Sequence, residues 1–373
     1  MKFLFVLGTR PEAIKLCPLI LHLKTQAHVE VCTTGQHKEL ITPFLKLFNV
    51  TPDYDLELLK PNQTLSDLSA RCIQAVTTVY EKVKPDCVIV QGDTTTSMCA
   101  ALAAFYQKIS VAHVEAGLRT YELYSPFPEE LNRQITGRIA HYHFVPTERN
   151  KKNLLAEGCD PKNIFMTGNT GIDALKWVLH NHPVPVNTIV DIDLTHKKLI
   201  LVTGHRREHF GLPFKQLCYG IRKIAETFDD VVIVYPVHLN PNVQKPVQEI
   251  LSGCDNIKLI APLEYPDFIS LMAKASLILT DSGGVQEEAP SLNVPILVMR
   301  ETTERQESVE QGFSFIVGTD SEKILDFTKR CLYEKEFYRP IGENPYGNGK
   351  AVEKIASILQ SKISETQKVM VEV

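Results

Sequence analysis

The chain has 373 residues, with 40 Lys and Arg against 44 Asp and Glu, so its formal net charge is −4. The apolar fraction of 44% excludes an intrinsically disordered chain, and the slightly acidic balance excludes a nucleic-acid binder that relies on bulk positive charge. No apolar run approaches the roughly 18 to 20 residues of a membrane-spanning helix. At about 150 residues per domain, the length predicts two or three domains.

Nine cysteines are spread over the chain without a CxxC pair, and their number is odd. Most of them lie in apolar stretches typical of strands or helices. This pattern predicts buried thiols in a reducing cytoplasm rather than disulfides or a zinc site. The apolar start of the chain, residues 3–7, ends at Gly8 and is too short for the apolar core of a signal peptide.

In the first half of the chain, short apolar runs alternate with amphipathic patterns. The clearest helical pattern covers residues 64–82, where Leu68, Cys72, Val76 and Val79 repeat every three to four positions. The predicted strands are residues 3–7, 29–33, 87–91, 111–114, 143–146 and 164–167. The predicted helices are residues 13–24, 64–82, 94–106 and 129–140, and one that Thr147 caps and Gly158 closes.

The alternation breaks between residues 181 and 196, where Pro183 and Pro185 interrupt a stretch without periodicity. Apolar strands that are each followed by a helix predict a parallel sheet covered on both faces. We therefore predict an α/β protein with two Rossmann-like, doubly wound parallel-sheet domains that face a cleft, residues 1–180 and 181–354. In the second domain the predicted strands are residues 199–203, 231–235, 257–260, 277–280, 294–299 and 315–317, with helices at residues 214–228 and 242–251.

Ligands of such sheets bind beyond the carboxyl ends of the strands, so the residues that follow each strand are candidates for a site. After the first strand, Arg10 and Lys15 add positive charge to a helix N-terminus, which favours an anion. An ordinary turn with two solvated cations would explain them equally well. The segment lacks the GxGxxG spacing of a dinucleotide site.

Three carboxylates follow later elements of the first half. Asp93 comes after the strand at 87–91, Glu115 after the strand at 111–114, and Glu129 opens the next helix. Asp93 could simply cap a helix, and Glu129 could complement the helix dipole or pair with Arg133. Together the three should converge on one sheet edge, where clustered carboxylates raise one another's pKa and become general acids and bases. Because a metal-binding DxD spacing is absent, we predict no cation there.

The second half carries the stronger phosphate signals. Residues 204–211 place His205, Arg206 and Arg207 between two glycines directly after a strand. His238, after the strand at 231–235, is a lone signal that could equally be structural.

The clearest anion signal is the segment that follows the strand at 277–280. Ser282, Gly283 and Gly284 would present backbone N–H groups to a phosphate at the positive end of a helix dipole. Glu288, one turn further on, suits the diol of a ribose. This combination is typical of a nucleoside diphosphate site, and Arg305 is a further candidate for a phosphate contact.

In this order the motifs resemble the non-hydrolysing UDP-N-acetylglucosamine 2-epimerase family from residue 3 to about residue 360. The motifs that carry the resemblance are GTRPEAIK at 8–15, GDTTT at 92–96, HVEAGLRT at 113–120, SPFPEE at 125–130, TGN at 167–169, TGHRRE at 203–208, YPVHLNPNV at 235–243, LTDSGGVQEEAPSL at 279–292, TTER at 302–305 and NPYGNG at 344–349.

The resemblance implies a glycosyltransferase-B-like fold whose C-terminal helix, about residues 355–373, packs back on the first domain. It implies a cytoplasmic homodimer that acts on a UDP-sugar without a metal or nicotinamide cofactor and without a nucleic-acid or membrane partner. The implied reaction is the reversible conversion of UDP-GlcNAc to UDP-ManNAc through elimination of UDP to 2-acetamidoglucal and re-addition. Such a product would supply precursors of surface polysaccharides.

Family position also implies a role for each site residue. The implied catalytic residues are Asp93, Glu115, Glu129 and His205, and the implied UDP ligands are Arg10, Lys15, Ser282, Gly283, Gly284, Glu288 and Arg305. Many bacterial members bind a second UDP-GlcNAc as an activator, and the matching positions here are Gln36, His37, Glu129, Arg206 and His238.

The chain departs from the family at a few positions near these motifs. Asn62 stands where some members carry an Arg, and Lys38 stands at the Arg of the family's QHRE stretch. Both departures argue against strong activation by substrate. His209 and Gln306 are also unusual, and they could tune the choice of sugar.

Several alternatives stay open on the sequence. A hydrolysing epimerase or an epimerase of a modified UDP-2-acetamido sugar would use nearly the same site. A two-domain glycosyltransferase fits the segment from Ser282 to Glu288 but leaves the three carboxylates of the first domain unexplained. A binding protein without chemistry leaves them unexplained as well.

Overall fold

The computed structural model describes residues 1–36, 38–204, 206 and 209–371. The chain forms two compact units. The N-terminal unit comprises Met1–Ala174 and the chain from Tyr346 onward, and the C-terminal unit comprises Leu175–Pro345. Our division of the chain into two domains at residues 180 and 181 stays a prediction.

The N-terminal unit is built on a seven-stranded sheet in which all paired strands are parallel. The strand order β3-β2-β1-β4-β5-β6-β7 is that of a Rossmann fold, with its switch point between β1 and β4. In chain order the elements are β1 (Lys2–Leu7), α1 (Arg10–Lys24), β2 (His28–Thr33), α2 (Lys38–Leu47), β3 (Tyr54–Asp55), α3 (Leu65–Val83), β4 (Cys87–Gln91), α4 (Thr95–Tyr106), β5 (Ser110–Val114), α5 (Glu129–Ile139), β6 (Tyr142–Val145), α6 (Glu148–Ala156), η1 (Pro161–Asn163), β7 (Ile164–Met166) and α15 (Ala351–Val371).

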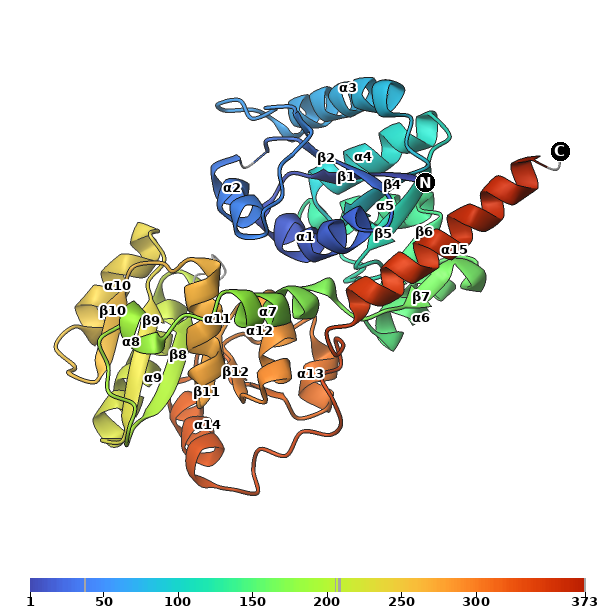
Figure 1. The fold of residues 1–373 in the computed structure, drawn as a ribbon. Helices are drawn as coiled ribbons and strands as arrows, with labels where there is room; N and C mark the ends of the chain where they lie inside the picture. Colours follow the sequence, from blue (N-terminus) through green and yellow to red (C-terminus); the bar gives the residue numbers. More distant parts are fainter. Residues whose placement is uncertain (37, 205, 207–208, 372–373) are drawn as a thin grey trace. The chain divides into compact units, whose positions relative to one another are not determined.

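Helices cover both faces of this sheet (Figure 1). Leu4 and Val6 of β1 pack in one cluster with residues of α3 and α4. Because side chains alternate along a strand, Phe3 and Phe5 point to the opposite face, and they are fully buried as well. Helix α15 packs against α1, which ties the C-terminal helix to the N-terminal unit.

The C-terminal unit has a six-stranded parallel sheet in the order β10-β9-β8-β11-β12-β13, with the corresponding switch point between β8 and β11. Its elements are β8 (Lys198–Thr203), α9 (Leu212–Thr227), β9 (Val231–Pro236), α10 (Pro241–Leu251), β10 (Ile257–Ile260), α11 (Tyr265–Lys274), β11 (Leu277–Thr280), α12 (Gly283–Glu288), η3 (Ala289–Leu292), β12 (Ile296–Val298), α13 (Gln306–Glu310), β13 (Ser314–Ile316) and α14 (Ser321–Tyr333). The helix α7 (Thr170–Asn181) begins in the N-terminal unit and ends in this one.

The predicted fold class, two α/β units with doubly wound parallel sheets, is confirmed. The stretch at 181–196 is less irregular than we expected, because it contains the short helix α8 (Val186–Ile189). Among the residues that the structure describes, no helix is long and apolar enough to cross a membrane.

Candidate functional site

The carboxyl ends of β1 and β4 meet at the switch point of the N-terminal sheet, and close packing there explains Gly8. A Cβ at Gly8 would lie 2.2 Å from Thr34 Oγ1 and 2.4 Å from Thr96 Oγ1. Any side chain would therefore push these two hydroxyl groups apart. Thr96 also donates to Gln36 Oε1 at 2.9 Å, which connects this position to one of the residues predicted for an activator site.

Helix α1 begins at Arg10, which is exposed, and buries Glu12 completely. Glu12 Oε2 accepts hydrogen bonds from the backbone N–H groups of Gly8 and Thr9, at 2.9 and 2.7 Å, and Oε1 accepts one from the Thr94 hydroxyl at 2.7 Å. Burial raises the pKa of Glu12 to about 7, although these hydrogen bonds act in the opposite direction. Glu12 thus links the loop after β1 to the loop after β4, a function that we did not predict.

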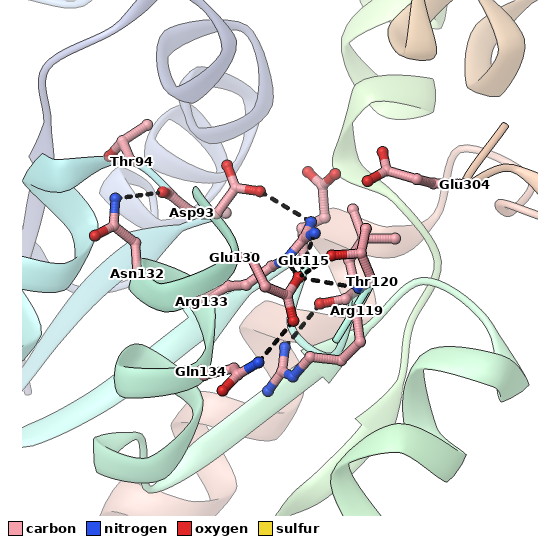
Figure 2. Close-up of polar contacts among 12 residues, drawn as sticks. Asp93, Thr94, Glu115, Arg119, Thr120, Glu130, Asn132, Arg133, Gln134 and Glu304 are labelled. Carbon is pink, nitrogen blue, oxygen red and sulfur yellow. Dashed lines mark hydrogen bonds and ion pairs between the residues drawn. The ribbon is translucent and has the colours of Figure 1, made fainter. Parts of the chain in front are cut away.

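Asp93 follows β4 after Gly92 and does not cap the next helix. The N-cap of α4 is Thr94, whose hydroxyl accepts from Ser97 N at 2.9 Å. The Asp93 side chain is 31% exposed, and its Oδ2 accepts from Arg133 Nη1 at 3.3 Å. Asn132 Nδ2 donates to the Asp93 carbonyl oxygen at 3.0 Å (Figure 2). Thr94 therefore caps α4, so helix capping does not explain Asp93.

Glu115 follows β5, the strand next to β4, and has a backbone φ of +60°. A side chain other than glycine in this region costs about 1 to 3 kcal/mol, a strain that recurs at functional sites. Glu115 Oε2 accepts from Lys15 Nζ at 2.5 Å and from Gln91 Nε2 at 2.6 Å. The structure thus joins Lys15, predicted to bind UDP, to Glu115, predicted to be catalytic.

Glu129 is the first residue of α5 and is half-buried. The i+4 pairing that we considered between Glu129 and Arg133 is not the one formed. Arg133 instead pairs with Glu130 at 2.5 Å and with Asp93, because Glu130 is the acid on the buried side of the helix. His37, another residue predicted for an activator site, lies outside the described residues.

In the C-terminal unit, Ser282 follows β11 and is the N-cap residue of α12, so Gly283 and Gly284 occupy its first turn. A Cβ at Gly283 would lie 2.8 Å from the guanidinium carbon of Arg305, so only glycine lets this cation pack against the helix start. The helix has six residues and continues into η3.

Arg305 is held by two carboxylates. Its Nε and Nη2 donate to Glu287 Oε1 at 3.0 and 2.8 Å, and its Nη1 donates to Glu304 Oε2 at 2.7 Å. A phosphate at Arg305 would have to share the guanidinium with both acids.

Glu288 lies at the end of α12, and its side chain is largely buried. The hydroxyl of Tyr265, the first residue of α11, donates to Glu288 Oε1 at 2.8 Å. Burial raises the pKa of Tyr265 well above its usual value, so this hydroxyl stays a donor. No pattern in the sequence predicts this contact.

Asp281 is fully buried and contacts Arg206, which follows β8. Asp281 Oδ2 accepts from the backbone N–H of Arg206 at 2.8 Å, and Arg206 Nε donates to the Asp281 carbonyl oxygen at 3.1 Å. His209 is buried in the same loop, with its Nδ1 3.9 Å from Asp281 Oδ2. His205, predicted to be catalytic, lies outside the described residues.

His238, after β9, is exposed. Its Nδ1 accepts from the backbone N–H of Asn240 at 3.1 Å, which leaves Nε2 as the proton-bearing nitrogen of the neutral ring. Within the described ranges, no three His, Cys, Asp or Glu side chains gather where they could hold a metal ion.

Comparison with known proteins gives one consistent result. A family model described as UDP-N-acetylglucosamine 2-epimerase matches residues 21–360. The UDP-N-acetylglucosamine 2-epimerases of Yersinia pestis and Escherichia coli K12 are each 50% identical to this chain, over 97% of it and 99% of their own length. Among solved structures, the Neisseria meningitidis UDP-GlcNAc 2-epimerase bound to UDP-GlcNAc is similar with a TM-score of 0.90 and 46% identity, covering 97% of this chain and all of that one. The Methanocaldococcus jannaschii enzyme in complex with UDP-GlcNAc and UDP has a TM-score of 0.79 and 38% identity, with the same coverage.

Proposed function

This chain belongs to the UDP-N-acetylglucosamine 2-epimerase family, and from that premise we propose that it interconverts UDP-GlcNAc and UDP-ManNAc without releasing the free sugar. The observation that carries the proposal is the placement of two carboxylates at neighbouring strand ends, Asp93 after β4 and Glu115 after β5. Epimerisation exchanges a proton between two faces of one carbon, so it needs at least two acid–base groups.

The C2 proton of an acetamido sugar is too weakly acidic to be removed directly. In the proposed sequence, the C1–O bond to UDP therefore breaks first, and the bonding electrons leave with the diphosphate. A carboxylate then takes the C2 proton, and the electrons of that C–H bond form the C1–C2 double bond of 2-acetamidoglucal. Protonation of C2 on the opposite face and return of UDP to C1 complete the reaction. Asp93, Glu115, Glu129 and His205 are the residues that we propose for these proton transfers.

The departing diphosphate needs positive partners in the transition state. We propose Arg10, Lys15 and the N–H groups at the start of α12 for this purpose, with Ser282, Gly283 and Gly284 at that helix start and Arg305 beside it. Glu288 would accept hydrogen bonds from the ribose diol, and its bond from Tyr265 supports this by fixing the carboxylate. Gln36, His37, Glu129, Arg206 and His238 would line the place of a second, activating UDP-GlcNAc.

We further propose that the protein is a cytoplasmic homodimer. Phe105 and Tyr106 at the end of α4 are 57% and 65% exposed, which favours a protein contact at this position. Nine free cysteines fit a reducing compartment. Light scattering on the purified protein and fractionation of the cells that produce it test the two proposals.

The reaction itself is tested by incubating the purified protein with UDP-GlcNAc in heavy water. We expect UDP-ManNAc to form and deuterium to enter C2 of both sugars. Complete retention of the C2 proton would overturn the proposed chemistry. Release of UDP in proportion to each ManNAc formed would instead assign the protein to the hydrolysing type, and a panel of UDP-2-acetamido sugars would show which sugar turns over fastest.

A further inference from the structure

Three neighbouring polar residues of α5 are buried, although the helix lies at the edge of the candidate site. Glu130, Asn132 and Arg133 are 0%, 4% and 2% exposed. Charged side chains are rarely buried to this extent unless they are paired. Their partners show what the arrangement does.

Arg133 connects a buried acid to an acid of the candidate site. Its Nη2 lies 2.5 Å from Glu130 Oε2 and its Nε donates to the same oxygen at 2.7 Å, while its Nη1 donates to Asp93 Oδ2 at 3.3 Å (Figure 2). The guanidinium therefore contacts Glu130 through Nε and Nη2 and Asp93 through Nη1.

Glu130 is itself fixed by the segment that follows Glu115. It accepts hydrogen bonds from the backbone N–H groups of Thr120 and Tyr121, at 3.0 and 3.1 Å, and from Gln134 Nε2 at 2.7 Å. Burial alone would raise the pKa of Glu130, but these hydrogen bonds and the charge of Arg133 lower it to about 2. Glu130 thus carries its negative charge throughout the working range of an enzyme.

The backbone around Asp93 is held as well. Asn132 donates to the carbonyl oxygen of Asp93, and His113 Nε2 lies 2.7 Å from the carbonyl oxygen of Gly92. Helix α5 therefore contacts Asp93 twice, once at the main chain and once at the carboxylate. Among the described residues of the N-terminal unit, the titratable and charged side chains that contact this loop or its partners include Arg133 and Glu130 from α5, Glu12 and Lys15 from α1, His113 from β5, and Glu115 after β5.

We propose that Arg133 is a positioning residue that orients the Asp93 carboxylate and keeps it deprotonated, and that Glu130 balances the charge of Arg133 so that Asp93 keeps a net negative charge and can act as a base. The proposal rests on the catalytic function proposed for Asp93. The charges of Asp93, Arg133 and Glu130 sum to −1, which leaves one negative charge for the proton transfer. Without Glu130, Arg133 would pair with Asp93 alone and weaken it as a base.

Two substitutions with opposite consequences test the proposal. Arg133→Gln removes the cation, so Asp93 becomes easier to protonate, and we expect the acidic limb of the kcat/KM profile to move to higher pH. We also expect kcat to fall about 100-fold with KM within a few-fold, because the carboxylate is no longer oriented. Glu130→Gln should move the acidic limb to lower pH. A role in folding alone would not move the two limbs in opposite directions.

Two further variants complete the design. Arg138→Gln replaces an exposed arginine of the same helix and should behave like the wild type. Arg133→Lys keeps the charge with fewer hydrogen bonds. We therefore expect its kcat to lie between those of Arg133→Gln and the wild type, and its acidic limb to lie at the wild-type position. It also carries the test if Arg133→Gln does not fold.

The outcomes separate the positioning proposal from the proposed function. If Arg133→Gln folds and keeps the wild-type kcat and acidic limb, or if both limbs move in the same direction, the positioning proposal is wrong. If Asp93→Asn still exchanges the C2 proton at the wild-type rate in heavy water, the function proposed for Asp93 is wrong, whatever Arg133 does.

Discussion

Lys15 of α1 and Glu115 after β5 form a 2.5 Å ion pair, although they lie 100 positions apart in the chain. Both side chains are largely buried, with 14% and 10% exposed. The pair places a cation predicted to face the diphosphate directly against a carboxylate predicted to handle the C2 proton. Leaving-group stabilisation and proton transfer would then be coupled through one contact.

We expect Lys15→Met and Glu115→Gln each to lower kcat/KM about 100-fold, since each removes one member of the pair from the reacting centre. The double variant should lose little more than the more damaged single variant, because residues that act as a unit are not additive. Lys24→Met, at the exposed end of the same helix, is the control and should keep the wild-type kcat/KM. Losses that multiply in the double variant would show that the two side chains act independently.

Glu12 predicts a pH dependence of stability. Its pKa is about 7 in the folded protein against 4.5 ordinarily, so the folded state binds more protons between these values and stability falls as the pH rises. The difference corresponds to roughly 3 kcal/mol as an upper bound. Glu12→Gln should remove this loss, because one amide oxygen can accept the bonds from Gly8 and Thr9 while the amide nitrogen donates to Thr94.

Urea unfolding of both proteins between pH 4.5 and 8 measures the effect. Asp173 also titrates in this window, so only the difference between the two proteins is informative. The free energy of unfolding of Glu12→Gln, relative to that of the wild type, should increase with pH. Glu81→Gln, on the exposed side of α3, should show no such trend. A constant difference across the range would mean that Glu12 stays charged when folded.

The strands and their order along the chain were the part of the fold that the sequence predicted best. Residues 87–91 were predicted as a strand and form β4, because a buried parallel strand is a continuous apolar run. Helix α2 was missed, since Pro43 lies within it and ordinarily interrupts a helical pattern. The linker helix α8 is too short for any periodicity to show.

For the site, strand ends pointed to Asp93 and Glu115, but tertiary partners decide the rest. Glu129 and Glu130 look alike in sequence, as acids in a first helical turn, and only the packing of Thr120 and Tyr121 against Glu130 separates them. Glu12 could have been recognised, because Thr9 and Glu12 have the spacing of a capping box. Its bond to Thr94 spans 82 positions, and no local pattern encodes it.

Tyr265 provides a test of the ribose contact proposed for Glu288. Tyr265→Phe removes the hydrogen bond that fixes the Glu288 carboxylate, so we expect KM for the UDP-sugar to rise about ten-fold with kcat within about three-fold. Steady-state kinetics and calorimetric titration with UDP measure both quantities. Tyr219→Phe, an exposed tyrosine of α9, should leave them unchanged. An unchanged affinity for UDP in Tyr265→Phe would argue against Glu288 as a nucleotide ligand.

Gly283 and Gly284 form a matched pair for the packing of Arg305. A Cβ at Gly283 would lie 2.8 Å from the guanidinium carbon, whereas a Cβ at Gly284 would meet nothing closer than 3.9 Å. Gly283→Ala must therefore shift the Arg305 guanidinium and weaken its bonds to Glu287 and Glu304, and we expect a loss of about 1 kcal/mol in the free energy of unfolding. Gly284→Ala should be neutral or stabilising by up to about 1 kcal/mol, because alanine is the better helix former. Both alanines keep the backbone N–H, so denaturant unfolding without ligand isolates the packing effect, and equal stabilities of the two variants would mean that Arg305 moves aside at no cost.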